Sequence, residues 1–222
     1  DYTSLSYNVL MGLTLGLSGV PYYGHDIGGF FGDRPDKNLL IRWCQSAVFQ
    51  PRFVIHSWNP DGVPTEPWSY PEISGVIADL VKEHYRYMPY IYNCGIESSQ
   101  NGTPMERPLA LEFSNDARVD FEDFNFMFGD SILVVAPVKE SEESFPVYLP
   151  AGEEWIEPVQ QQLFQGGRHI EVDYPLEGIR YFVKAGSVVP VTDHYGTLFH
   201  AFFERLIFKL YPKPAVTTEY HY

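Results

Sequence analysis

An imidazole and a carboxylate lie among four glycines in the segment Gly24-His25-Asp26-Ile27-Gly28-Gly29-Phe30-Phe31-Gly32. The apolar run Val20-Pro21-Tyr22-Tyr23 comes directly before it and predicts a short buried strand. Glycine-rich chain after a strand lets the backbone approach a ligand closely, and such loops often carry functional side chains. Asp26 is therefore the first candidate for a functional residue.

The elements that must position Asp26 alternate between helix and strand. Leu10, Leu13 and Leu17 recur at helical spacing and predict a helix that stops at Ser18-Gly19. A second helix is expected over residues 36–49, and Pro51 closes it. The next strand, Phe53-Val54-Ile55, delivers His56-Ser57-Trp58-Asn59 at its C-terminal end.

A long third helix is expected from Pro71 towards Tyr92. One apolar face marks it, formed by Ile73, Val76, Ile77, Leu80, Val81 and Met88. This order is typical of parallel βα units, whose functional loops follow the C-terminal ends of the strands. Two such units cannot close a barrel, so this half of the chain is expected to be the tail of a larger α/β domain.

From about Glu112 the pattern changes to short strands separated by turn residues, which predicts a small antiparallel β domain. The strand-like runs are residues 132–135, 145–149, 180–183 and 187–189, and a further run lies at 206–211.

Composition and charge limit the classes of partner. The 222 residues are 45% hydrophobic and carry a formal net charge of −14, which argues against binding to nucleic acid or to an anionic membrane. No apolar run is long enough to span a bilayer, and no signal peptide is recognised at the N-terminus. The sequence does not determine the compartment, although a cytoplasmic location is favoured.

The two cysteines, Cys44 and Cys94, are expected to be buried thiols, since they form neither a disulfide framework nor a metal-ligand pair. A metal site that combines His25, Asp26 and His56 is disfavoured because no ligand spacing supports it. No cofactor is expected.

Several motifs in one order resemble glycoside hydrolase family 31, which includes α-glucosidases and α-xylosidases. They are Gly19-Val20-Pro21, Gly24 to Phe30, Arg42-Trp43-x-Gln45, Phe49-x-Pro51, His56, Arg86-x-x-x-Pro89-Tyr90-x-Tyr92, Gly102-x-Pro104-x-x-Arg107-Pro108-Leu109, Phe128-Gly129-Asp130, Ala136-Pro137-Val138, Val147 to Pro150 and Phe182 to Pro190. The resemblance covers nearly the whole chain from Leu5 to Pro190.

The resemblance implies α/β plus all-β architecture, with the last βα units of a (β/α)8 TIM barrel followed by a small antiparallel β-sandwich domain. Residues 1–112 would belong to the C-terminal part of the catalytic barrel and residues 113–198 to the proximal C-terminal β domain. Residues 199–222 would begin the distal C-terminal β domain.

The same resemblance implies a retaining α-glycosidase that hydrolyses terminal α-glucosidic linkages of oligosaccharides. Both catalytic aspartates of the family, the nucleophile and the acid/base, are expected upstream of these residues, so no catalytic residue is assigned in this chain. Retaining hydrolysis needs two carboxylates about 5 Å apart. The chain alone is therefore predicted to be inactive, with the rest of the parent polypeptide as its partner.

Five residues are the candidates for substrate binding: Asp26, His56, Phe30, Trp58 and Trp68. The family places a sugar-hydroxyl-binding histidine at the position of His56, and the acid at Asp26 lines the subsite where cleavage occurs. The three aromatic rings would cover apolar faces of pyranose rings. Their alternatives are a structural Asp26 that holds its own glycine loop, a structural His56, and aromatic rings that pack in the core.

One departure from the family pattern concerns an arginine that many members carry two residues before this histidine. Val54 stands there in this sequence, and Arg52 comes two places earlier. The proline-rich loop 60–71 is a candidate for shaping specificity. An α-xylosidase or α-glucosyltransferase of the same family and a non-catalytic carbohydrate-binding module are the alternative functions.

Overall fold

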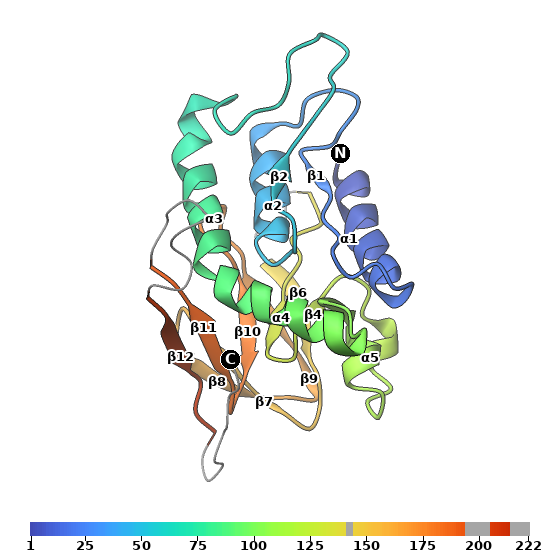
Figure 1. The fold of residues 1–222 in the computed structure, drawn as a ribbon, viewed down its shortest axis with the longest axis vertical. Coiled ribbons are helices and arrows are strands. Elements are labelled where there is room, and N and C mark those ends of the chain that lie inside the picture. Colours follow the sequence, from blue (N-terminus) through green and yellow to red (C-terminus); the bar gives the residue numbers. More distant parts are fainter. Residues whose placement is uncertain (141–143, 194–204, 214–222) are drawn as a thin grey trace.

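The computed structural model describes residues 1–140, 144–193 and 205–213. Its first half contains α1 (Tyr2–Leu17), β1 (Asp26–Ile27), α2 (Lys37–Ala47), β2 (Val54–Ile55), the 3-10 turn η1 (Pro71–Ile73), α3 (Ser74–Arg86) and α4 (Met88–Asn101). Strands β1 and β2 pair in parallel, and α1, α2 and α3 lie beside them (Figure 1). The predicted order of parallel βα units is confirmed for this half.

The second half is built from short strands. They are β3 (Glu106–Pro108), β4 (Phe126–Phe128), β5 (Ile132–Val134), β6 (Ser144–Leu149), β7 (Glu154–Glu157), β8 (Gln162–Gln165), β9 (Arg168–Asp173), β10 (Tyr181–Lys184), β11 (Val188–Val191) and β12 (Ile207–Leu210), with short helical turns α5 (Leu109–Glu112) and η2 (Val119–Phe121). Antiparallel pairing gives a six-stranded sheet of order β3-β4-β5-β10-β7-β8 and two pairs, β6-β9 and β11-β12. The predicted antiparallel domain is confirmed.

The six-stranded sheet separates two apolar cores, as the period-two alternation of strand side chains requires. Phe126, Ile132 and Val183 belong to the core shared with the helices. Met127, Leu133 and Phe182 belong to the core shared with β6 and β9. Helix α4 lies between the other helices and the sheets (Figure 1), so the two halves of the chain share one packed interior.

Helix α1 forms as expected and turns one face towards the core. Leu5, Val9 and Leu13 are buried, whereas Leu10 and Leu17 are exposed. Gly16 allows the buried face to lie close to β3, because a Cβ there would lie only 3.1 Å from Glu106 O. The spacing of the leucines therefore predicted the helix correctly.

The strand expected at residues 20–23 is not present, since this segment is irregular and Val20 and Tyr22 are exposed. The strand instead begins at Asp26, which is thus a strand residue and not the residue after a strand. The long helix expected from Pro71 is divided into η1, α3 and α4, with a break at Tyr87. Pro89 has no N–H to continue the helical hydrogen bonds across that break.

Both cysteines are buried free thiols, as expected. Strand β3 precedes residue 112 and pairs with β4, so the six-stranded sheet starts before the proposed boundary between residues 112 and 113. The other proposed boundary, between residues 198 and 199, lies outside the described residues. No helix within the described part of the chain has the length and apolar character to cross a bilayer.

Candidate functional site

Strands β1 and β2 bring the two predicted site segments together. Asp26 pairs with Val54, and Ile27 pairs with Ile55. The pairing continues past the strands through a parallel bridge between Phe31 and Trp58, where Trp58 N donates to Phe30 O at 2.5 Å. The glycine-rich segment and the segment after His56 therefore run side by side in the same direction.

Alternation along the strands assigns the side chains to two faces. Ile27 is fully buried and belongs to the core that also contains α2 residues. Asp26 is only partly buried and lies on the opposite face of β1. Val54 lies on the same face of β2, and Arg52 and His56, in the extended chain on either side of β2, reach Asp26 and Phe30 on that side.

Asp26 forms an ion pair with Arg52. Arg52 Nη2 lies 2.8 Å from Asp26 Oδ1, and Arg52 Nη1 donates to Gly24 O at 2.7 Å. The Asp26 side chain is 27% exposed and that of Arg52 is 47% exposed, so solvent screens this pair in part. In the part of the chain that the structure describes, no hydrogen bond engages Asp26 Oδ2, and this oxygen is available to a ligand.

Phe30 and His56 form the second feature of the site. Their ring centroids lie 5.3 Å apart with the planes tilted by 41°, and both side chains are exposed. An apolar ring face and an imidazole with hydrogen-bonding capacity are thus presented together at the C-terminal end of the strand pair. This combination suits a ligand that has both hydroxyl groups and C–H faces.

The other two aromatic candidates are placed differently. Trp58 is 69% exposed and is attached to the Phe30–Phe31 segment by the parallel bridge. Trp68 is also exposed, but no ring contact among the described residues joins it to Phe30 or His56. The structure therefore brings Asp26, Phe30, His56 and Trp58 onto two adjoining segments and leaves Trp68 on the neighbouring loop.

His25 has a structural role. It is 3% exposed, its Nδ1 accepts a hydrogen bond from Trp43 Nε1 at 2.7 Å, and Nε2 contacts the Gln50 carboxamide at 2.8 Å. Burial, together with the charge of Arg52, lowers the pKa of His25 to about 3, so the ring is neutral at physiological pH. His25 ties the glycine-rich segment to α2 and the chain after it.

Polar groups hold the loop after His56 in one conformation. Asn59 is 4% exposed, and its Nδ2 donates to Val63 O at 2.7 Å and to Thr65 Oγ1 at 3.3 Å. Thr65 N donates to Ser57 Oγ at 2.7 Å. Arg34, which follows the glycine-rich segment, forms an ion pair with Asp61 of this loop, and its Nη2 lies 2.8 Å from Asp61 Oδ2. The loop is therefore preorganised next to the Phe30–His56 pair.

Residues 1–140, 144–193 and 205–213 contain no group of three His, Cys, Asp or Glu side chains arranged to hold a metal ion. Two residues of the site were not among the predicted ones: Arg52, which pairs with Asp26, and Phe31, which is 76% exposed beside Trp58. Arg52 lies four residues before His56, so strand alternation alone places both on one face.

Comparison with known proteins gives this site a context. Residues 1–94 match the model of the glycosyl hydrolases family 31 TIM-barrel domain, and residues 102–189 match the model of the family's C-terminal domain. A probable glucan 1,3-alpha-glucosidase of Arabidopsis thaliana is 35% identical over 196 residues, which are 88% of this chain and 21% of that protein. An alpha-xylosidase of Saccharolobus solfataricus is 33% identical over 86% of this chain and 26% of its own length.

Solved structures agree with these matches. The GH31 dextranase of Flavobacterium johnsoniae in complex with isomaltotriose superimposes with a TM-score of 0.88 at 29% identity, over 96% of this chain and 27% of the dextranase. A GH31 alpha-xylosidase from a soil metagenome in complex with xylose gives a TM-score of 0.77 at 29% identity, over 84% of this chain and 31% of that chain. The predicted fold class, a barrel portion followed by an antiparallel β domain, is confirmed.

Proposed function

The chain belongs to glycosyl hydrolase family 31, and we propose that it forms one side of the sugar subsite of a retaining α-glycosidase acting on terminal α-glucosidic linkages of oligosaccharides. The chain spans 21% of the length of the plant relative, so the activity is that of a longer polypeptide that contains these residues. The observation that supports this proposal is the Phe30–His56 pair at the ends of two parallel strands, with ring centroids 5.3 Å apart.

Each side chain has a distinct task in this proposal. The Phe30 ring covers the apolar face of a pyranose, and a ring nitrogen of His56 hydrogen-bonds a hydroxyl of the same sugar. Asp26 Oδ2 accepts a hydrogen bond from a second hydroxyl while Arg52 holds Oδ1. Hydrogen bonds to an ionised carboxylate are stronger than those between neutral groups. Trp58 extends the aromatic surface, and Trp68 reaches the sugar from the neighbouring loop.

The chemical step needs groups beyond these. A retaining mechanism requires one carboxylate as nucleophile and a second as acid/base, whereas Asp26 is the one acid on β1 and β2 and is paired with Arg52. We therefore assign substrate positioning to this chain and expect the two catalytic carboxylates elsewhere in the polypeptide. The isolated 222-residue chain should show no glycosidase activity.

The test is a substrate panel with the complete polypeptide. Nitrophenyl α-glucoside, α-xyloside and α-galactoside should be compared by kcat/KM, with the α-glucoside expected to be the best substrate. A preference for the α-xyloside would replace this proposal with the α-xylosidase alternative, which the 33% identity to the Saccharolobus solfataricus enzyme favours. Transfer products longer than the substrate would instead indicate a glucosyltransferase.

A further inference from the structure

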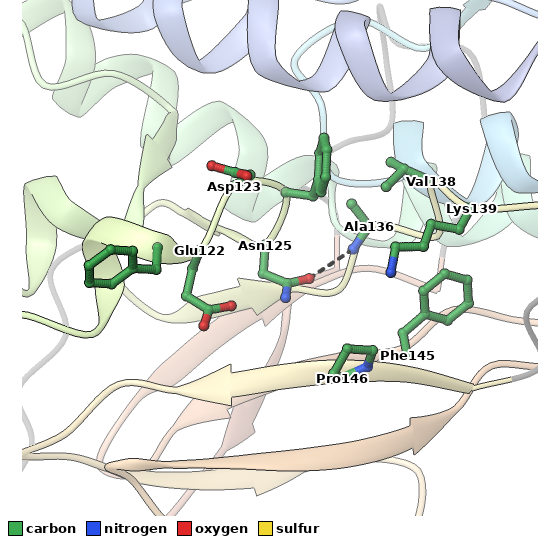
Figure 2. Close-up of a pocket in the computed structure, with 10 residues that line it drawn as sticks. Glu122, Asp123, Asn125, Ala136, Val138, Lys139, Phe145 and Pro146 are labelled. Atoms are coloured by element: carbon green, nitrogen blue, oxygen red, sulfur yellow. Dashed lines mark hydrogen bonds between the residues drawn. The ribbon is translucent and has the colours of Figure 1, made fainter.

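A cavity of about 180 Å³ lies in the antiparallel half of the chain (Figure 2). Its walls come from the segment after η2, from the segment after β5 and from the start of β6. The lining residues are Phe121, Glu122, Asp123, Phe124, Asn125, Ala136, Val138, Lys139, Phe145 and Pro146. None of these residues belongs to the Phe30–His56 site, and the proposed function does not use them.

Asn125 places a hydrogen-bond donor in this cavity. The residue is 8% exposed, and Ala136 N donates to its Oδ1 at 3.3 Å. That hydrogen bond fixes the orientation of the amide, so Nδ2 points away from Ala136 towards Pro146 (Figure 2). Within the described residues Nδ2 has no hydrogen-bond acceptor. Nδ2 is not among the fully buried atoms without a partner, so it is open to the cavity and can donate to a ligand there.

Glu122 adds a hydrogen-bond acceptor beside it. The Glu122 side chain is 14% exposed, and His169 Nε2 contacts its Oε1 at 2.7 Å. The carboxylate points to the same side of the segment as the Asn125 amide (Figure 2). Its second oxygen has no hydrogen bond within the described part of the chain. An amide donor next to a carboxylate acceptor matches neighbouring hydroxyl groups, each of which can accept one hydrogen bond and donate another.

Aromatic surface completes the cavity. Phe121 is 81% exposed at its rim, an unusual exposure for a large apolar ring, and Phe124 and Phe145 also line it. The lining carries carboxylates at Glu122 and Asp123 and a cation at Lys139, so charges of both signs are present and a neutral ligand is favoured over a small ion. A neutral ring that carries hydroxyls on its edge and C–H groups on its faces satisfies all three features.

We propose that this cavity is a second sugar-binding site, which holds one pyranose unit of a glucan away from the Phe30–His56 site. The volume is below the range of about 300–1,000 Å³ typical of sites for larger ligands, so a single ring fits better than an oligosaccharide. The choice of an α-linked glucose polymer as ligand rests on the proposed function, whereas the preference for a neutral sugar rests on the cavity alone.

The experiment is affinity electrophoresis of the complete polypeptide in gels that contain dextran, an α-glucose polymer. Asn125→Asp keeps the acceptor for Ala136 N–H and replaces the free donor by a carboxylate oxygen, and Phe121→Ala removes an exposed ring without opening the core. Each variant should weaken the apparent affinity for dextran at least fivefold. Leu163→Ala, an exposed apolar residue of β8 in the same half of the chain, is the matched control and should be retarded like the wild type.

His56→Ala separates the two sites, because it should still be retarded by dextran if the cavity binds sugar. Unchanged retardation of both cavity variants, loss of retardation in His56→Ala alone, or no retardation of the wild type would each overturn the proposal. Phe121→Ala decides the outcome even if Asn125→Asp fails to fold. Hydrolysis of a soluble α-glucoside without retardation by dextran would refute the second site only, and retardation without hydrolysis would refute the proposed function only.

Discussion

Arg52 Nη2 lies 2.8 Å from Asp26 Oδ1 across the parallel strand pair, and the same guanidinium binds Gly24 O at 2.7 Å. Side chains as well as backbone therefore join the two strands that present the candidate site. Val54 of β2 pairs with Asp26 but has no charge to offer its carboxylate. The Asp26 carboxylate is thus balanced by Arg52, which lies two residues before Val54 in the sequence.

Asp26→Asn should lower kcat/KM for an α-glucoside in the complete polypeptide. The substitution removes the charge of the hydrogen-bond acceptor and breaks the ion pair with Arg52. Hydrogen bonds to charged groups contribute about 1.5–3 kcal/mol, which corresponds to a decrease of about 10- to 150-fold. Steady-state kinetics measures it, and unchanged kcat and KM would exclude a role of Asp26 in sugar binding.

Arg52→Met should reduce kcat/KM less than Asp26→Asn does, because Arg52 acts through Asp26 and not on the sugar. The variant keeps much of the side-chain volume but leaves the carboxylate without its cation. Arg52→Lys is the matched control, since it keeps the charge and loses the fork that reaches both Asp26 and Gly24. Its kcat/KM should lie between that of the wild type and that of Arg52→Met. A larger loss in Arg52→Met than in Asp26→Asn would contradict this order.

The adjacent phenylalanines offer an internal comparison. Phe30 is in ring contact with His56, whereas Phe31 is more exposed and pairs through its backbone with Trp58. Phe30→Ala should raise KM for an α-glucoside about tenfold or more, because aromatic contacts of this kind contribute about 0.5–1.5 kcal/mol beyond the apolar area that they bury. Phe31→Ala should have the smaller effect. Equal KM values for the two variants would argue against a sugar on the Phe30 ring.

The sequence predicted the parts of the fold that depend on local periodicity. Continuous apolar runs at 132–134 and 181–183 predicted β5 and β10, and Gly19, with a φ of 85°, follows the end of α1 as expected. Strands with exposed and polar residues gave no such signal, which is why β8, with the sequence Gln-Leu-Phe-Gln, was not predicted. Its pairing with β7 stabilises it, and that contact is set by the tertiary fold.

In the candidate site, too, the local sequence predicted the segments, whereas contacts that depend on the tertiary fold were not predicted. The motif Gly24 to Phe30 and the position of His56 pointed to two segments that the structure places side by side, because they contain or adjoin the paired strands. The ion pair of Arg52 with Asp26 depends on the register between β1 and β2, which no spacing within one segment reveals. The structural role of His25 depends on Trp43 and Gln50, which α2 and the chain after it bring close.

The burial of Glu106 predicts that the free energy of unfolding falls as the pH rises. It is 3% exposed, and neither carboxylate oxygen has a hydrogen-bond partner within the residues that the structure describes. Burial raises its pKa from 4.5 to about 8, so the folded protein holds this proton after the unfolded chain has lost it. The contribution of Glu106 to stability is therefore complete below pH 4.5, decreases between pH 4.5 and about 8, and is constant above.

Glu106→Gln should remove most of this pH dependence, because the amide has nearly the same shape and never ionises. At about 1.4 kcal/mol per pKa unit the effect amounts to several kcal/mol. The unfolding temperature of the complete polypeptide, measured from pH 5 to pH 9, should therefore fall less steeply in the variant. Glu171→Gln, at an exposed position of β9, is the control and should keep the wild-type slope. Parallel curves for Glu106→Gln and the wild type would show that Glu106 ionises normally.

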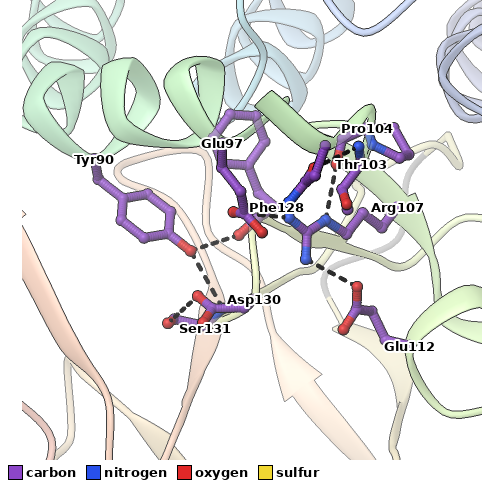
Figure 3. Close-up of polar contacts among 10 residues, drawn as sticks. Tyr90, Glu97, Thr103, Pro104, Arg107, Glu112, Phe128, Asp130 and Ser131 are labelled. Atoms are coloured by element: carbon purple, nitrogen blue, oxygen red, sulfur yellow. Dashed lines mark hydrogen bonds and ion pairs between the residues drawn. The ribbon is translucent and has the colours of Figure 1, made fainter. Parts of the chain in front are cut away.

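Gly129 occupies a tight position between β4 and β5, and its replacement tests how α4 packs on the sheet. Its φ is 60°, and a Cβ there would lie 2.4 Å from Tyr90 Oη and 2.6 Å from Cys94 Sγ. Tyr90 cannot move easily, because its hydroxyl donates to Phe128 O at 2.8 Å and accepts from Ser131 N at 3.2 Å (Figure 3). Overpacking and a left-handed backbone should together cost about 3 kcal/mol or more.

At that cost, Gly129→Ala should lower the unfolding temperature by about 6–12 °C. Gly75→Ala is the matched control, because a Cβ at this position of α3 meets nothing within 4 Å. Alanine has a higher helix propensity than glycine, so the Gly75→Ala variant should be more stable than the wild type by up to about 1 kcal/mol. Differential scanning calorimetry of both variants measures the contrast. Equal unfolding temperatures would mean that Tyr90 and Cys94 do not pack against Gly129, and the contact of α4 with the β4–β5 turn would then have to be abandoned.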